Sequence, residues 1–83
     1  MLSETQLAHL EHIVHSISTE LSIEEAMLEA QQTLTLVLCN DTTCFRPLHI
    51  PAQEVDVAAA LDGQPRAQHA LQEWLHSALQ GMV

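Results

Sequence analysis

The spacing of apolar residues changes abruptly near residue 32, and this change constrains the fold more than any other feature of the sequence. Before it, aliphatic residues recur at steps of three and four positions, at Leu7, Leu10, Val14, Ile17 and Leu21. These steps return to one side of an α-helix, since each residue turns by about 100° around the axis. After it, TLTLVLC at 33–39 alternates between two faces, as a half-buried β-strand does. The chain therefore needs both kinds of element, and the predicted class is α+β.

The N-terminal part is predicted to contain two helices. Ser3 and Gln6 fit the capping box that opens a helix, and the aliphatic series extends this helix to about Leu21. Ser22 and Glu25 form a second such box, which predicts that another helix begins at once. The apolar residues of this second helix would form its buried face: Ile23, Ala26, Met27 and Ala30.

A β-hairpin is predicted next. The polar cluster 40–43 is typical of a turn, and FRPLHI at 45–50 would return as a strand whose Pro47 places it at an edge or a bulge. The leucine and isoleucine residues of both strands occupy even positions. Because side chains alternate along a strand, both sets reach one core only if even positions pair, as in Leu36 opposite Leu48.

Two further helices are predicted after the hairpin. Pro51 suits the start of a helix over about Ala52 to Leu61, although EVDVAA in this stretch could also form a strand. Gly63 would end it, and Pro65 would begin a last helix that Gly81 closes. The predicted fold is thus two N-terminal helices, a β-hairpin and two C-terminal helices in a single domain over residues 1–83.

The composition indicates a thin core and an acidic surface. The chain has one Phe, one Trp and no Tyr among 83 residues, so the core must consist mainly of leucine. So small a core has reason to cover apolar surface with a second copy, as a homodimer, or with a partner protein. Two basic residues face eleven acidic ones, for a formal net charge of −9 at pH 7. This charge disfavours binding to nucleic acid or to anionic membranes.

Several functional classes lack their usual signals. The N-terminal sequence has no signal-peptide pattern, and no run of about 18 apolar residues is present, so no membrane span is expected. We therefore expect a cytoplasmic protein, in which thiols stay reduced. The motifs G-x-S-x-G and H-E-x-x-H and glycine-rich phosphate loops are also absent. Neither enzyme activity nor a cofactor is predicted.

The two cysteines, Cys39 and Cys44, stand at the ends of the predicted turn. In the even-to-even register they point to opposite faces of the hairpin, whereas a disulfide needs Cβ atoms about 3.5–4.5 Å apart. A rival register, reached through a bulge at Pro47, would place them opposite each other. A zinc site of Cys39, Cys44 and His49 lacks a fourth ligand. We expect both cysteines to be packing residues and no metal to bind; a metal- or redox-responsive module is the alternative.

The stretch ELSIEEAMLE at 20–29 carries the candidate binding residues. Within the predicted helix, like charges four positions apart would be destabilising, and no Lys or Arg is found from residue 1 to residue 45. A solvated acidic face is the simpler interpretation, and a surface for a basic protein is the functional one. The candidate residues are Glu20, Glu24, Glu25 and Glu29.

The predicted function follows from this acidic surface. We expect a small acidic, non-enzymatic protein that binds a basic protein partner, as an inhibitor, an immunity- or antitoxin-like factor, an adaptor or a dedicated chaperone. The glutamates would steer the partner before an apolar patch is buried. Trp74 is the candidate anchor of that patch, although its neighbours Leu71 and Leu75 also suit a core tryptophan.

Overall fold

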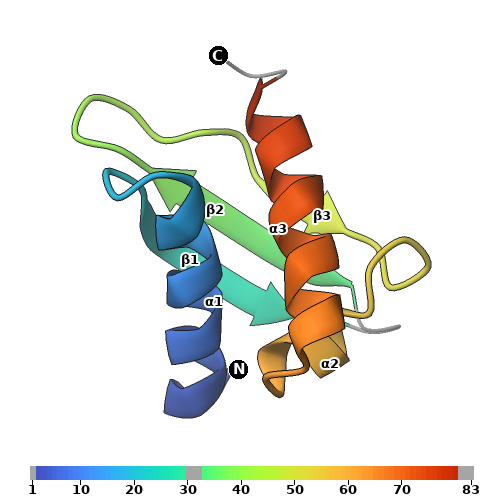
Figure 1. Cartoon of the computed structure of the whole chain (residues 1–83). Coiled ribbons are helices and arrows are strands. Elements are labelled where there is room, and N and C mark those ends of the chain that lie inside the picture. Colours follow the sequence, from blue (N-terminus) through green and yellow to red (C-terminus); the bar gives the residue numbers. More distant parts are fainter. Residues whose placement is uncertain (1, 30–32, 81–83) are drawn as a thin grey trace.

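A three-stranded antiparallel sheet lies against two helices in a computed structural model that describes residues 2–29 and 33–80. The elements in chain order are α1 (Glu4–Ile17), β1 (Ser22–Leu28), β2 (Leu34–Cys39), β3 (Leu48–Ile50), α2 (Val57–Leu61) and α3 (Pro65–Gln80). The strand order is β1-β2-β3, and α1 and α3 lie side by side on one face of the sheet (Figure 1). The α+β class is confirmed, but the described residues form three helices where four were expected.

The first helix begins as the sequence predicts and ends earlier. The Ser3 hydroxyl accepts a hydrogen bond from the Gln6 N–H at 3.2 Å, and the Gln6 side chain accepts one from the Ser3 N–H at 3.0 Å. This capping box is confirmed. The helix stops at Ile17, because Ser18 takes an extended conformation. Leu21 still reaches the core, from the loop that follows the helix.

Residues 22–28, expected as part of a second helix, form strand β1 instead. The register of β1 against β2 shifts between Ile23 and Glu25, which makes Glu24 the extra residue of a β-bulge. Ile23 and Ala26 therefore both pack toward the core although they are three positions apart. A step of three is typical of a helix, and the bulge is the physical reason that the helix prediction is wrong.

The buried face proposed for that helix is corrected as well. Met27 lies on the outer side of the sheet, where its side chain is 45% exposed. Leu28 takes the core-facing position, opposite Leu34. Ser22 caps no helix, and its hydroxyl donates a hydrogen bond to the Cys39 carbonyl at 3.2 Å. Ala30, the last residue of the predicted face, lies outside the described residues.

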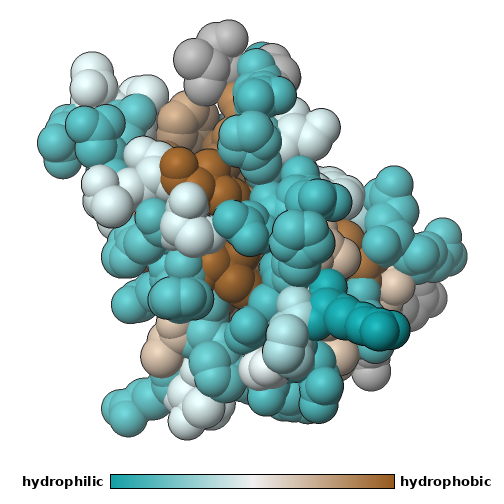
Figure 2. Space-filling model, in the orientation of Figure 1, coloured by the Kyte–Doolittle hydropathy of each residue, from teal (hydrophilic) through white to brown (hydrophobic). Residues whose placement is uncertain are grey.

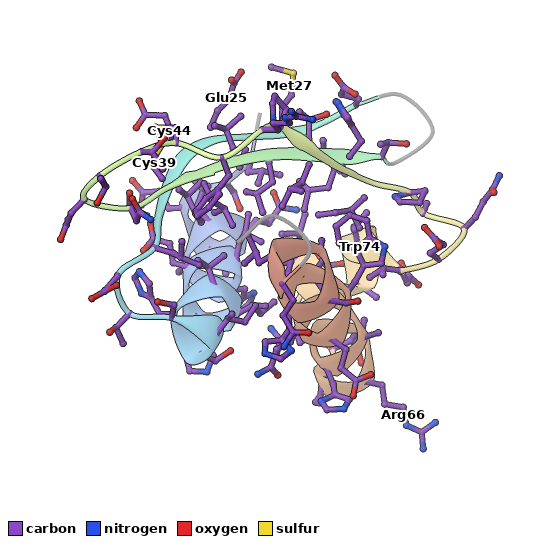
Figure 3. All side chains as sticks on the ribbon, turned by 90° about the horizontal axis from the view of Figure 1, so that it is seen from above. Glu25, Met27, Cys39, Cys44, Arg66 and Trp74 are labelled. Carbon is purple, nitrogen blue, oxygen red and sulfur yellow. A yellow bond between two sulfur atoms is a disulfide. The ribbon has the colours of Figure 1, made fainter. Side chains whose placement is uncertain are left out.

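The central strand forms the middle of the core. Leu36 pairs with Leu48, so the predicted even-to-even register of β2 and β3 is confirmed. Leucine and isoleucine side chains of this face are covered by α1 and α3, and those of Leu34, Leu36 and Ile50 are fully buried. Figure 3 shows the sheet lying over the helices, with the side chains of Glu25 and Met27 pointing away from them. The sheet therefore has one covered face and one open face.

The C-terminal part keeps one predicted helix whole and shortens the other. The helix predicted over Ala52 to Leu61 forms only at Val57–Leu61, where Asp56 is the N-cap and accepts a hydrogen bond from the Ala59 N–H at 3.1 Å. Gly63 follows with a φ of 96°, as expected of a residue that ends a helix. The last helix begins at Pro65 as predicted, and Gly81 lies outside the described residues. Among the described helices, none is long and apolar enough to span a membrane.

Candidate functional site

The four candidate glutamates lie along β1 and at its two ends, and not on a helix. Glu24 is the bulged residue, and Glu25 faces away from the helices (Figure 3). All four side chains are exposed. Within residues 2–29 and 33–80, none of them forms an ion pair with a basic side chain. We name this set the acidic edge: Glu20, Glu24, Glu25 and Glu29.

The strand changes how these charges are spaced. In a helix, residues four apart would be neighbours, whereas along a strand they are separated by about 13 Å at about 3.3 Å per residue. Neither arginine forms an ion pair with these glutamates in the described residues. Arg66 extends from the far end of α3 (Figure 3), and Arg46 belongs to the segment that leads into β3, across the sheet from β1. The negative charge of the acidic edge is thus extended and uncompensated in the described part of the chain.

An apolar groove begins next to Glu20. It has a volume of about 470 Å³ and lies where the C-terminal ends of α1 and α3 meet the loop between β2 and β3. Figure 2 shows hydrophobic surface in this region, between α1 and α3 in the upper half of the molecule. Asn40 and His76 contribute polar groups to its wall. We name it the apical groove, and its apolar lining consists of Ile17, Leu21, Phe45 and Leu79.

Sequence reasoning missed the apical groove. Ile17 was assigned to the helix stripe and Phe45 to the return strand, and nothing in the spacing of the sequence links them. Only the packing of three separate segments brings Ile17, Phe45 and Leu79 together. Glu20 is the one candidate residue that also lines the groove, so the acidic edge and the apical groove are continuous at this position.

Trp74, the candidate anchor, lies away from the apical groove. Its side chain is partly buried and packs against the core. The indole N–H donates a hydrogen bond to Glu54 Oε2 at 3.4 Å, which connects α3 to the segment between β3 and α2. In Figure 3 Trp74 is on the opposite side of the molecule from the two cysteines. This geometry gives Trp74 a packing role, and a role in partner binding stays a prediction.

Cys39 and Cys44 form a disulfide, so the prediction that both are packing residues is wrong. They face each other in an isolated antiparallel bridge between the last residue of β2 and the segment that precedes β3. Between the Leu36–Leu48 pair and this bridge, β2 advances by three residues and the returning chain by four. The extra residue falls within 45–47, the segment that contains Pro47. The hairpin thus uses both registers, one at each end: the preferred prediction assumed one throughout, and the rival with a bulge near Pro47 is the arrangement found.

The zinc alternative loses its ligands in this arrangement. Both sulfur atoms are bonded to each other, and His49 lies on the open face of the sheet, opposite Thr35. Its Nδ1 is 3.2 Å from Thr35 Oγ1. In the part of the chain that the structure describes, no three His, Cys, Asp or Glu side chains are arranged to hold a metal ion. Of the metal- or redox-responsive module proposed as the alternative, the redox interpretation remains.

Two histidines of α1 make contacts with backbone groups outside the helix. His9 Nδ1 lies 2.7 Å from the Leu61 carbonyl oxygen, and His15 Nε2 lies 3.1 Å from the Leu21 carbonyl oxygen. Since a carbonyl oxygen only accepts, each ring nitrogen is the donor in these pairs. These side chains connect α1 to the end of α2 and to the loop before β1. They therefore have structural roles.

Comparisons with protein-family models, with curated proteins and with solved structures found no match. Three features of the chain bear on its function: the acidic edge, the apical groove and the disulfide. None of the four carboxylates of the acidic edge is buried, and the groove beside Glu20 is lined mainly by aliphatic and aromatic carbon. Such an arrangement suits the binding of a cationic and partly apolar surface.

Proposed function

We propose that this chain is a small acidic, non-enzymatic binding protein that engages a basic surface of another protein through the acidic edge. The observation that carries the proposal is the row of exposed carboxylates along β1, without an ion-pair partner in the described residues. A basic partner would be attracted at long range by this row and by the formal net charge of −9. The partner's function would then be inhibited, protected or escorted, as by an immunity-like factor, an adaptor or a dedicated chaperone.

The apical groove supplies the apolar contact that this mechanism needs. Charge alone accelerates encounter, while burial of apolar surface slows dissociation. Glu20 lines the groove, so a partner side chain in the groove would sit beside a carboxylate. This supports a partner that presents an aliphatic or aromatic side chain next to a lysine or arginine. Phe45 and Ile17 join Trp74, which lies away from the groove, as proposed apolar contacts.

The location and the excluded partners form part of the proposal. We place the protein in the cytoplasm, and we propose that neither nucleic acid nor an anionic membrane is a partner. The formal net charge of −9 supports the second point, because like charges would meet without release of counterions. In the cytoplasm a disulfide is usually transient, so the Cys39–Cys44 bond would form and break there.

A matched pair of variants tests the proposal. In one, the acidic edge carries glutamine at all four positions, as E20Q, E24Q, E25Q and E29Q. In the control, four exposed acidic residues elsewhere are neutralised, as E4Q, E11Q, D41N and D62N, which changes the net charge equally. Partners captured from the native host at low salt are identified by mass spectrometry, purified and titrated against each variant.

The expected result is a basic partner whose affinity falls with salt and is lost in the first variant but kept in the control. Equal loss in both variants would show that only net charge matters. Capture of no basic protein at low salt would refute the proposal.

A redox-responsive module is the second candidate function, and the disulfide is the observation that favours it. Asn40 and Phe45 directly follow the two cysteines, and both line the apical groove. Cys44 is exposed, so a dithiol reductant could attack its sulfur: the Cys39–Cys44 bond breaks, each cysteine gains a hydrogen, and the reductant becomes a disulfide.

The test of this candidate is the redox state inside cells. Cells are quenched with acid, free thiols are alkylated, and the intact mass is measured before and after oxidative stress. A redox module predicts alkylated protein that converts to the unalkylated disulfide form on oxidation. A chain that stays fully in one form under both conditions contradicts it.

A further inference from the structure

The two edges of the sheet differ in their capacity to accept another strand. Among the described residues, β1 pairs only with β2, and it is seven residues long. The opposite edge, β3, has three residues between Pro47 and Pro51, neither of which has a backbone N–H to donate. A sheet edge with a long run of main-chain donors and acceptors is a template for strand addition. Only the β1 edge has that length.

The register indicates which main-chain groups face outward from β1. The Glu29 N–H donates a hydrogen bond to the Thr33 carbonyl at 2.8 Å, so these residues occupy a hydrogen-bonded position of the β1–β2 ladder. Hydrogen-bonded and non-hydrogen-bonded positions alternate along an antiparallel pair. Ala26 and Leu28, which lie opposite Leu36 and Leu34, hold the alternate positions. Their N–H and C=O groups therefore point away from β2, toward the outer edge.

From this geometry we infer that β1 accepts an extended basic segment of the partner as a fourth strand of the sheet. The inference rests on the proposed function and specifies its partner. A strand added beside β1 places one side chain opposite Glu25 and another opposite Met27, both on the open face of the sheet. The first position suits lysine or arginine. The second suits an aliphatic residue, since Met27 is 45% exposed.

A second copy of the chain fits this edge poorly. Each copy carries a formal net charge of −9, and pairing of two β1 strands would bring the acidic edges of both copies together. Like charges on adjacent strands are destabilising, and acidic side chains with a bulge are common protections against self-pairing. A basic strand meets no repulsion between like charges, and the glutamates attract it instead. The segment recognised has a basic and an aliphatic residue two positions apart.

The probe for this inference is a short synthetic peptide, Thr-Lys-Thr-Val-Thr-Lys-Thr-Val, which presents lysine and valine two positions apart on one strand face. Three proteins are titrated with it: the wild type, Ala26→Pro and Ala26→Ser. Proline removes the outward N–H of Ala26 and keeps all four glutamates, and proline is tolerated where a strand N–H faces solvent. Serine keeps the N–H and is the matched control. Amide hydrogen exchange in the wild type, with and without peptide, is a second measurement that does not depend on any variant.

We expect Ala26→Pro to weaken peptide binding at least about tenfold, while Ala26→Ser binds like the wild type. We also expect the peptide to slow exchange of the Ala26 and Leu28 amides. If Ala26→Pro binds like the wild type and these amides are not protected, strand addition is refuted while charge-driven binding stands. If the peptide binds the variant with four acidic-edge glutamines as tightly as the wild type, the proposed function itself fails.

Discussion

β2 has one neighbour on each side, and the pairing on each side contains a shift of one residue. Toward β1 the extra residue is Glu24, and the strand continues beyond it as a long acidic edge. Toward β3 the extra residue lies within 45–47, and a disulfide closes the pairing just beyond it. A one-residue register shift thus occurs on both sides of β2, and a disulfide lies beside it only on the β3 side. The closed side, toward β3, is held by a covalent bond, whereas the open side, toward β1, is held by main-chain pairing alone.

The largest expected effect comes from the strand that both sides share. Leu36 is fully buried and pairs with Ala26 on one side and Leu48 on the other. Leu36→Ala should lower the free energy of unfolding by about 2–5 kcal/mol, because it leaves a cavity in the middle of the core. A domain of this size has little stability to lose, so urea denaturation should show a largely unfolded protein.

The matched control is the next residue along β2. Val37 lies on the open face of the sheet opposite Glu25, and Val37→Ala should change the free energy of unfolding by less than about 1 kcal/mol. A loss as large as that of Leu36→Ala would contradict an open face. It would show that a second copy or another element covers this side of the sheet in solution.

The second prediction concerns the closed side alone. Replacing Cys39 and Cys44 by serine should lower the free energy of unfolding by about 2 kcal/mol, since the crosslink closes only a short loop. The loosening should be local. The Phe45 N–H, which donates to the Leu38 carbonyl at 2.8 Å, should exchange faster, whereas the Glu29 N–H at the other side of β2 should keep its rate.

Wild-type protein treated with a dithiol is the control for this variant and should show the same local change. Faster exchange along β1 in either sample would contradict the comparison, because it would mean that the disulfide holds both sides of the sheet. If neither amide changes, the backbone pairing alone fixes the turn.

Periodicity predicted the elements in which one register runs without interruption. The leucines of 34–38 gave β2 and its pairing with β3, and the stripes on α1 and α3 gave both helices. Two of the errors arose where one residue is inserted. The inserted Glu24 sets Ile23 and Ala26 three positions apart, although both face the core. The extra residue within 45–47 brings Cys39 and Cys44 opposite each other, where an uninterrupted register would point them to opposite faces. Pro47 is a local signal of the shift within 45–47, whereas the shift at Glu24 is set by pairing with β2 and has no such signal.

The candidate site was predictable in its charge and not in its shape. The absence of basic residues before Arg46 is visible in the sequence, and it identified the glutamates of the acidic edge. Their placement on a sheet edge, however, depends on the bulge. The apical groove depends on contacts among Ile17, Phe45 and Leu79, which are far apart in the chain. Residue type can be read from a sequence, whereas a concave surface requires the packing of its walls.

The third prediction has the smallest expected effect on stability and tests the open side directly. Deleting Glu24 would place Ile23 and Ala26 two positions apart, so both would face the core in an uninterrupted strand. The pairs on either side of Glu24, Ile23–Leu38 and Glu25–Val37, keep their register without it, so the free energy of unfolding should change by less than about 1 kcal/mol. A straight edge strand is a better template for pairing between copies. We therefore expect the deletion variant to self-associate at concentrations where the wild type does not, as measured by sedimentation velocity.

Glu24→Gln separates the two protections that act at this position, because it removes the charge and keeps the bulge. If it stays monomeric while the deletion variant associates, the bulge is the main barrier to self-pairing. If both associate equally, charge is the barrier, and a basic strand would then pass it without any change in the backbone. If neither associates, the β1 edge is protected by something other than Glu24, and the contrast between an open and a closed side of the sheet would have to be abandoned.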